Sequence, residues 1–369
     1  MKNMASINYK KSGINYQQID PIKKLAQNFA QQTAKNLKQN GGLELSASRG
    51  ESAYVWRQGS KYFATVVEGL GTKNLVADEM YKLTGKSYYD VVGHDTVASI
   101  INDLVSVGAS PLVVSAYWAV GKSDWLADTK RASDLVRGWK NACDLAGASW
   151  GGGETPALPG IINPETIDLG GSATGIIKNK RELLTDKNIR ANDRIIFIKS
   201  NGINMNGLSL ARAVATKLPH RYATKLTNQK TYGETLLTKS NIYARLIKNI
   251  FKAKINLHYA SNITGHGLRK VMRGRPNFSY IIEKLFKPLE IFNFIQTQAK
   301  LSDYEMYQTF NMGQDYALFV SAQDVKKTLR VIAQSGFKGL DAGHVKHGER
   351  QVEIKPKKII YKSESLDLR

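Results

Sequence analysis

The chain has 369 residues, more than one hydrophobic core usually serves, so we expect two domains. Apolar residues make up 42% of the chain and charged residues 23%, proportions that exclude a disordered or fibrous protein. The net charge of +22 is carried by lysines spread along the whole sequence, which indicates a solvated basic surface and no nucleic-acid partner.

Strands, helices and glycine-rich loops are predicted to alternate in the first half of the chain. Runs of β-branched and aromatic residues predict strands over residues 61–69, 111–120 and 166–178. Apolar residues at helical spacing predict helices over residues 20–40, 95–105 and 124–145. In the first helix, Asp20 is the expected N-cap and Pro21 the first helical residue. Residues 149–160 are expected to form a turn-rich loop.

The second half repeats this organisation. A polar segment at residues 178–192 precedes it, and there we place the boundary between domains 1–180 and 181–369. The predicted elements are a strand over 195–199, a loop over 200–207, a helix over 232–251, a glycine loop over 262–267, and a strand and helix within 315–336.

Residues 67–80, VEGLGTKNLVADEM, bring two glycines, a threonine and a lysine together directly after a predicted strand. The stretch is not a P-loop, because neither Gly-Lys-Ser tripeptide, at Gly85 or Gly121, has a glycine five residues earlier. It is not a dinucleotide fingerprint, because Asn74 stands where the third glycine is needed. The glycines still let backbone amides approach a phosphate, to which Lys73 adds charge, and a plain turn is the alternative.

Carboxylates lie in or beside the glycine loops, at Glu68, Asp95, Asp103, Glu154 and Asp168. Magnesium is usually held by a few carboxylates together with substrate phosphates, so this set suits Mg²⁺ with ATP. A structural interpretation stays open for three of them: Asp95 as a helix cap, Asp103 as a solvated helix residue and Asp168 as a turn residue.

Seven motifs occur in an order and spacing that resemble aminoimidazole ribonucleotide (AIR) synthetase, the phosphoribosylformylglycinamidine cyclo-ligase family. They are VEGLGTK, DTVASIINDLVSVGASPL, GGETPALPG, DLGGSATG, SNGINMNG, NITGHG and EIFNFIQTQAKLSDYEMYQTFNMG. The opening INYKKSGIN is also similar to that family's N-terminus, so the resemblance covers nearly the whole chain.

This resemblance implies an α/β (α+β) fold with two domains. Residues 1–180 would bind ATP and contribute to a β-barrel shared within a homodimer, and residues 181–369 would form an α/β sandwich. The implied activity is an ATP- and Mg²⁺-dependent cyclo-ligase of purine biosynthesis, with formylglycinamidine ribonucleotide as the small-molecule substrate. ATP would activate the formyl oxygen as a phosphate, which ring closure would expel. Such a reaction needs positioning and charge stabilisation and no covalent nucleophile.

Site residues are implied position by position. The implied nucleotide- and phosphate-binding residues are Glu68, Gly69, Gly71, Thr72, Lys73, Asn102, Asp103, Gly152, Gly153, Glu154, Thr155, Ser200, Gly202, Asn206, Gly207, Thr264, Gly265, Gly267, Asn311 and Gly313. The implied metal ligands are Glu68, Asp95, Asp103 and Glu154. The implied catalytic residues are Lys73, Asp95, Asn204 and His266.

Four positions depart from the family pattern. Glu68 stands for the usual aspartate, and Asn204 stands where the family commonly has a histidine. His266 replaces a glycine, and Asp315 replaces a small residue. A hypothesis is that His266 supplies the missing imidazole; an exposed loop histidine is the alternative.

Other functions stay open on the sequence alone. Another ATP-using member of the superfamily would phosphorylate a different acceptor, but selenophosphate synthetase would need a reactive cysteine near the N-terminus, and the only one is Cys143. A catalytically silent paralogue is motivated by Asn204 and Asp315, and a nucleic-acid binder by charge alone. With no signal core and no run of roughly 20 apolar residues, we expect a cytoplasmic protein without membrane contact.

Overall fold

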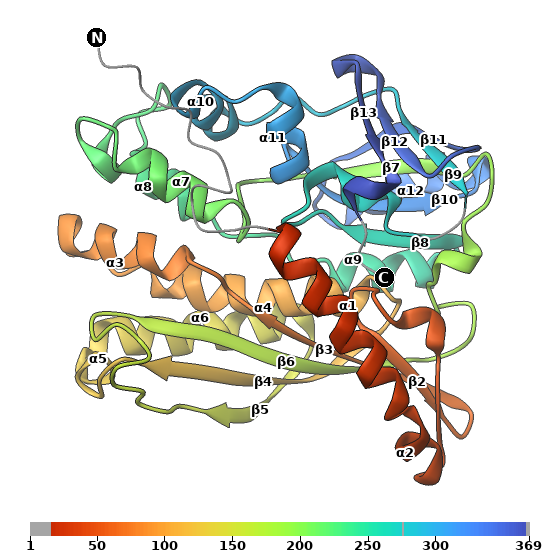
Figure 1. Cartoon of the computed structure of the whole chain (residues 1–369), viewed down its shortest axis with the longest axis horizontal. Helices are drawn as coiled ribbons and strands as arrows, with labels where there is room; N and C mark the ends of the chain where they lie inside the picture. Colours follow the sequence, from red (N-terminus) through yellow and green to blue (C-terminus); the bar gives the residue numbers. More distant parts are fainter. Residues whose placement is uncertain (1–15, 275–276, 367–369) are drawn as a thin grey trace.

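Two β-sheets form the framework of this computed structural model, which describes residues 16–274 and 277–366 (Figure 1). The strands of the first sheet run in the order β1 (Gly42–Glu44), β2 (Tyr54–Gln58), β3 (Lys61–Gly69), β6 (Ile167–Ile177), β4 (Ser110–Val120) and β5 (Ser149–Glu154). Its neighbours are antiparallel except β4 and β5, which are parallel.

The second sheet contains the strands of the second half of the chain. Their order is β13 (Ile359–Lys362), β12 (Gln351–Ile354), β9 (Phe278–Ile282), β11 (Gly339–His347), β7 (Arg194–Lys199), β10 (Gln314–Val320) and β8 (Leu257–Asn262). Only β12 and β9 pair in parallel. All residues of β8, β9 and β10 are buried, including polar ones such as His258, Asn262 and Asp315.

Helices cover one face of the first sheet. The helices of the N-terminal half are α1 (Tyr16–Gln32), α2 (Ala34–Gln39), α3 (Lys73–Thr84), α4 (Tyr89–Val105), α5 (Asp124–Ala127) and α6 (Thr129–Ala146). Figure 1 shows α4 and α6 on the same side of the strands β4, β5 and β6. A Cβ atom on Gly138 of α6 would lie 2.2 Å from the Asp90 carbonyl oxygen of α4, so this glycine permits the close crossing of the two helices.

The helices of the second half are shorter. They are α7 (Leu208–Ala215), α8 (Tyr232–Leu236), α9 (Ala244–Lys252), α10 (Glu290–Ala299), α11 (Asp303–Thr309) and α12 (Val325–Gln334), with the 3-10 helix η5 at Gly267–Met272. Helix α12 packs on β7 and β11, and α9 contacts both α12 and α4, so α9 joins the two halves.

Most predicted elements are confirmed, including the strands that became β3, β4, β6, β7 and β10 and the helix that became α12. The predicted start of the first helix is wrong. Residues before Asp20 are already helical, so Asp20 is not the cap, and Pro21 lies inside α1 and removes one internal hydrogen bond. The predicted loop at 149–160 begins as β5, because residues 149–154 pair with β4. The INYKKSGIN motif lies outside the described residues.

Three other predicted helices have different bounds. Helix α4 begins at Tyr89, so Asp95 lies inside it and not at its start. The helix predicted over 124–145 is divided at Asp128, whose carboxylate accepts from the Arg131 N–H and caps α6. The helix predicted over 232–251 is split into α8 and α9, because residues 238–241 form contacts with buried side chains of the first half. Within residues 16–274 and 277–366, no helix has the length and apolar character needed to cross a bilayer.

Candidate active site

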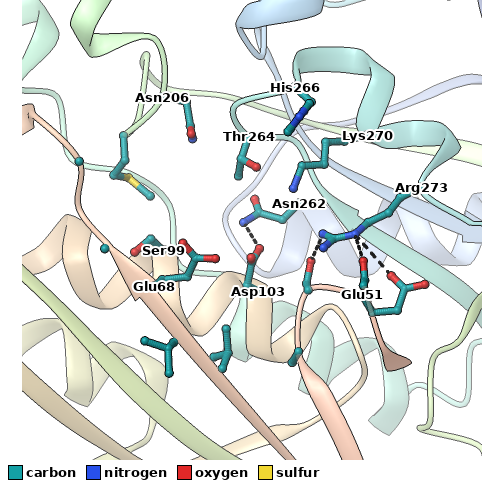
Figure 2. Close-up of a pocket in the computed structure, with 18 of the residues that line it drawn as sticks. Glu51, Glu68, Ser99, Asp103, Asn206, Asn262, Thr264, His266, Lys270 and Arg273 are labelled. Atoms are coloured by element: carbon teal, nitrogen blue, oxygen red, sulfur yellow. Dashed lines mark hydrogen bonds and ion pairs between the residues drawn. The ribbon is translucent and has the colours of Figure 1, made fainter. Parts of the chain in front are cut away.

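A pocket of about 760 Å³ lies where the two halves of the chain meet (Figure 2). The first half contributes the end of β3 with the glycine loop after it, one face of α4, and residues 48–54. The second half contributes residues 205–209, the end of β8 with the loop that follows, and side chains of η5. The pocket therefore gathers loops that are far apart in the sequence.

Two helices begin at the wall of this pocket. Helix α3 follows Gly71 and Thr72, and α7 follows Gly207; all three residues line the cavity. Gly71 and Gly207 have φ angles of 75° and 77°, a conformation that favours glycine. Neither helix has a side-chain N-cap or an acidic residue in its first turn. The first N–H groups of a helix without such partners are suited to bind an anion.

Two carboxylates share the floor of the pocket. Glu68 comes from the end of β3 and Asp103 from α4, and the Asn262 side chain of β8 donates to Asp103 Oδ1 over 2.7 Å. Burial, and next the neighbouring Asp103, raise the pKa of Glu68 to about 8. Two acids in this arrangement repel each other when both are ionised, so a cation would stabilise them.

Basic side chains face the two acids from η5 and its end. Arg273 donates to the Gly50 carbonyl oxygen over 3.1 Å and to Ser52 Oγ over 2.6 Å, so it fixes residues 50–52 against the second half. Figure 2 shows Lys270 directed toward Asn262 and Asp103. Burial, and next Arg273, lower the pKa of Lys270, while Asp103 and Glu68 act in the opposite direction.

His266 also lines the pocket and is buried. Burial, and next Lys270, lower the pKa of His266 to about 2, so its imidazole is neutral at physiological pH. A neutral imidazole of such low basicity is poorly matched to general-base catalysis but can still take part in hydrogen bonds.

The predicted residues divide into those that line the pocket and those that do not. The pocket brings together Glu68, Gly69, Gly71, Thr72, Asp103, Asn206, Gly207, Thr264 and His266. The residues absent from its lining are Lys73, Asp95, Asn102, Gly152, Gly153, Glu154, Thr155, Ser200, Gly202, Asn204, Gly265, Gly267, Asn311 and Gly313.

Lys73 and Asp95 form an ion pair with each other, and both side chains are fully buried. Lys73 Nζ also donates to the Thr238 carbonyl oxygen over 2.8 Å. Asp95 accepts from the Ser240 N–H over 2.8 Å and from Ser240 Oγ over 3.0 Å. The pair thus connects α3 and α4 to residues 238–240, and neither charge is directed at the cavity.

The loop at residues 200–207 is held from behind by several predicted residues. Asn311 Nδ2 donates to the Gly202 carbonyl oxygen over 3.1 Å, and the Ser200 N–H donates to the Gly313 carbonyl oxygen over 2.9 Å. Asn102 contacts the main chain of residues 241 and 243. These residues support the pocket wall without touching the cavity.

Residues 152–155 lie away from this pocket, on the exposed edge strand β5 and its end. Glu154 is level with Gly69 across the sheet, but β4 and β6 lie between their strands. A separation of three strand spacings is roughly 14 Å. Within one chain, Glu154 therefore does not join Glu68 and Asp103.

Several pocket residues were missed by the sequence interpretation, namely Ser99, Asn262, Lys270 and Arg273. Signals for them were present. Ser99 lies one helical turn before Asp103, and Asn262 is the first residue of the NITGHG motif. Lys270 and Arg273 form a basic pair three residues apart directly after that glycine loop.

No group of three or more His, Cys, Asp or Glu side chains in the described part of the chain could hold a metal ion. Glu68 and Asp103 nevertheless fit Mg²⁺, which commonly takes one or two protein carboxylates and completes its shell with phosphate and water. Asp95 is occupied by Lys73, and Glu154 is remote from the pair.

Comparisons with known proteins agree with this geometry. The family model described as AIR synthase related protein, N-terminal domain, matches residues 50–177, and the model of the corresponding C-terminal domain matches residues 190–355. A phosphoribosylformylglycinamidine cyclo-ligase of Clostridium novyi (strain NT) is 36% identical over 293 residues, 78% of this chain and 82% of that protein. This chain belongs to the phosphoribosylformylglycinamidine cyclo-ligase family.

Other cyclo-ligases of the family match over a similar or greater length. The protein of Methanocaldococcus jannaschii is 33% identical, covering 83% of each chain. The protein of Carboxydothermus hydrogenoformans is 30% identical over 365 residues, 95% of this chain and 99% of its own. The cyclo-ligase resemblance seen in the motifs is thereby confirmed.

Solved structures show that the fold extends beyond the cyclo-ligases. The thiamine-monophosphate kinase of Stenotrophomonas maltophilia K279a has a TM-score of 0.57 at 15% identity, covering 82% of this chain and 88% of that one. Hydrogenase maturation protein HypE in complex with ATP has a TM-score of 0.56 at 14% identity, covering 79% and 80%. At such identities the likeness concerns the fold alone.

Proposed function

We propose that this chain catalyses the ATP-dependent cyclisation of formylglycinamidine ribonucleotide to 5-aminoimidazole ribonucleotide, with release of ADP and phosphate, in purine biosynthesis. The observation that carries the proposal is a single pocket in which two uncapped helix N-termini lie beside the Glu68–Asp103 pair. The cyclo-ligase names of relatives that match most of this chain support the same activity.

The phosphates of ATP are proposed to bind at the start of α3, where the amides of Gly71 and Thr72 border the cavity. HypE, which shares the fold, binds ATP, and this supports nucleotide use by the same fold here. Asn206 and Gly207, at the start of α7, would hold the anionic group of the second substrate. The two helix ends would then orient two anionic ligands toward each other.

Glu68 and Asp103 are proposed to hold Mg²⁺, with Asn262 fixing the orientation of the Asp103 carboxylate. When bound, the ion would neutralise charge on the phosphates of ATP. Lys270 would add a positive charge on the opposite side of the same cavity. This combination suits phosphoryl transfer, where positioning and charge stabilisation supply most of the catalysis.

The proposed chemistry requires that the formyl oxygen becomes a leaving group before the ring nitrogen attacks. The chain's part is to bring that oxygen near the terminal phosphate of ATP and to keep water out. His266, neutral and buried, is proposed to form a hydrogen bond with the substrate and not to act as a base. Lys73 and Asp95 are proposed to act indirectly, by fixing the start of α3.

We also propose that the protein is a cytoplasmic homodimer with domains 1–180 and 181–369. The side of the first sheet opposite α4 and α6 carries exposed apolar side chains, namely Val113 and Tyr117. Pairing of this face with a second copy would cover them and could close the two sheets into a barrel. The same pairing could place residues 152–155 beside the pocket of the other copy.

The purified chain incubated with Mg²⁺, ATP and formylglycinamidine ribonucleotide tests the activity, with thiamine monophosphate and selenide as competing acceptors. Equal amounts of ADP and aminoimidazole product from the first acceptor alone support the proposal. Turnover of thiamine monophosphate or selenide would show that the chain has the activity of a different member of the superfamily. ATP binding without turnover of any acceptor would show that the chain is a catalytically silent paralogue.

A further inference from the structure

Two of the positions that depart from the family pattern, Asn204 and Asp315, contact each other in the structure. They are 111 residues apart in the sequence, and Asn204 Nδ2 donates to Asp315 Oδ1 in a buried hydrogen bond. Neither residue lines the pocket, so this contact is not explained by direct ligand binding.

A β-bulge in the second sheet places Asp315 beside the loop at residues 200–207. In the pairing of β10 with β7, Gln314 lies opposite Lys199 and Tyr316 opposite Ile198, so Asp315 is the extra residue of a bulge. Bulges commonly turn a side chain away from the regular alternation, and this one lies where β7 ends and the loop at 200–207 begins.

The Asp315 carboxylate accepts hydrogen bonds from two segments of the chain. Besides Asn204, Tyr243 OH donates to Oδ2 over 2.5 Å and Asn241 Nδ2 donates to the same oxygen over 3.4 Å. Burial raises the pKa of Asp315 to about 6 although these donors lower it, so the group is an anion at neutral pH. The hydrogen bonds that it accepts are therefore charge-assisted.

The main chain of Asp315 holds a further segment of the wall. Its carbonyl oxygen accepts from the Ile263 N–H over 3.1 Å, between the pocket residues Asn262 and Thr264. One residue thus contacts the loop before α7 through its side chain and the loop after β8 through its backbone. Both loops contribute residues to the lining of the pocket.

Asn204 depends on this contact for its orientation. Its φ angle is 62°, in the left-handed region that asparagine tolerates better than most residues. The side-chain Oδ1 is buried without a hydrogen-bond partner among the described residues, so the bond from Nδ2 to Asp315 is the contact that fixes the amide. The next residues, Met205 to Gly207, line the pocket.

We propose that Asp315 and Asn204 form a positioning pair that sets the loop before α7 against the loop after β8, and thereby sets the affinity for the ligand at Asn206 and Gly207. This proposal deepens the proposed function and rests on it for the identity of that ligand. The pair acts through the loop, so its loss is expected to change substrate binding more than the chemical step.

Steady-state kinetics with formylglycinamidine ribonucleotide and MgATP test the functional part. Asn204→Gly removes the amide but keeps the left-handed backbone accessible. We expect kcat/KM for the ribonucleotide to fall roughly tenfold to a hundredfold, mainly through KM. Asn192→Gly is the matched control, because Asn192 has a φ angle of 70° in the second half but is exposed and absent from the pocket lining. An unchanged KM in Asn204→Gly would overturn the proposal.

Hydrogen exchange tests the structural part without any ligand, so it decides the question even if the wild-type chain does not turn over this substrate. In Asp315→Ala, the amides of residues 203–208 are expected to exchange faster than in wild type, while those of β7 and β11 keep their rates. Wild-type exchange across 203–208, or an equal increase in all strands of the second sheet, would contradict a positioning role. Lack of wild-type turnover, by contrast, would contradict only the proposed function.

Discussion

The two pocket carboxylates differ in how the rest of the chain supports them. Asp103 is buried in α4 and receives a hydrogen bond from Asn262, whereas Glu68 is half-buried near the end of β3. Residues that orient a metal ligand commonly contribute to metal affinity although they do not touch the ion. A substitution of Asn262 therefore changes the orientation of the Asp103 carboxylate without removing its charge.

We predict that Asn262→Ala weakens Mg²⁺ binding by roughly tenfold to a hundredfold, because the Asp103 carboxylate loses its fixed orientation. The measurement is the Mg²⁺ concentration for half-maximal turnover at saturating ATP. Asn256→Ala, which changes an asparagine just before the start of β8 and outside the pocket lining, is the control and should leave that concentration unchanged. An unaltered Mg²⁺ requirement in Asn262→Ala would contradict the proposed ligand pair.

Glu68 also predicts a pH dependence of stability in the chain without ligands. Its pKa is raised by burial and Asp103 from an ordinary 4.5 to about 8, so the folded state holds a proton that the unfolded state releases. Its contribution to stability is complete below pH 4.5 and is lost as the pH rises through 8. Glu68→Gln lacks this titration.

The test compares the free energies of unfolding of wild type and Glu68→Gln in urea with a metal chelator. Wild type should lose stability relative to the variant as the pH rises across that window. A difference between the two chains that stays constant with pH would show that Glu68 is an ordinary carboxylate.

At the level of elements, the buried Lys73–Asp95 pair locks α3 to α4 and to residues 238–240. Lys73→Met is predicted to lower the free energy of unfolding by about 3–5 kcal/mol, because it leaves the Asp95 charge buried without its partner. Urea denaturation measures this loss. Lys82→Met, on the same helix but exposed, should change stability little. If Lys73→Met kept full stability but lost affinity for ATP, Lys73 would instead bind the phosphates of ATP directly.

Helices and strands could be predicted where local sequence determines them, and not where contacts with distant residues do. The strands that became β3 and β4 contain runs of β-branched and aromatic residues, so local sequence was sufficient. The first residues of α4 could not be assigned locally, because polar His94 is buried by a contact of its Nε2 with the Ser240 carbonyl oxygen over 2.8 Å. The same long-range contacts break the helix predicted over 232–251.

Pocket residues could be predicted where they belong to one of the recognised motifs and their side chains or backbone face the cavity. The glycine loop, Asp103 and residues 206–207 were found from their motifs and do line the cavity. Lys73 and Asp95 were assigned to the site from the resemblance of their motifs, but the sequence does not reveal which side chains of a motif turn inward to pair with each other. Arg273 reaches the pocket only through its contacts with residues 50–52, a pairing across more than half of the chain that no local pattern encodes.

At the scale of the whole molecule, the face of the first sheet opposite α4 and α6 carries exposed apolar residues. The proposed homodimer covers it, so Tyr117→Lys on β4 is predicted to convert the dimer to monomers by burying a charge in the interface. Sedimentation velocity measures the mass. Ile360→Lys, which changes an exposed apolar residue of β13 in the second sheet, is the control. If Tyr117→Lys still formed dimers, the interface would lie elsewhere. A monomeric wild-type chain would contradict the proposed dimer.

In the proposed reaction, this pocket uses ATP to turn the formyl oxygen into a phosphate leaving group. The most direct measurement is turnover of formylglycinamidine ribonucleotide that carries oxygen-18 in the formyl group, followed by mass spectrometry of the released phosphate. We expect one heavy oxygen in each phosphate formed, in step with the aminoimidazole product. Unlabelled phosphate, with the heavy oxygen released into water, would contradict it.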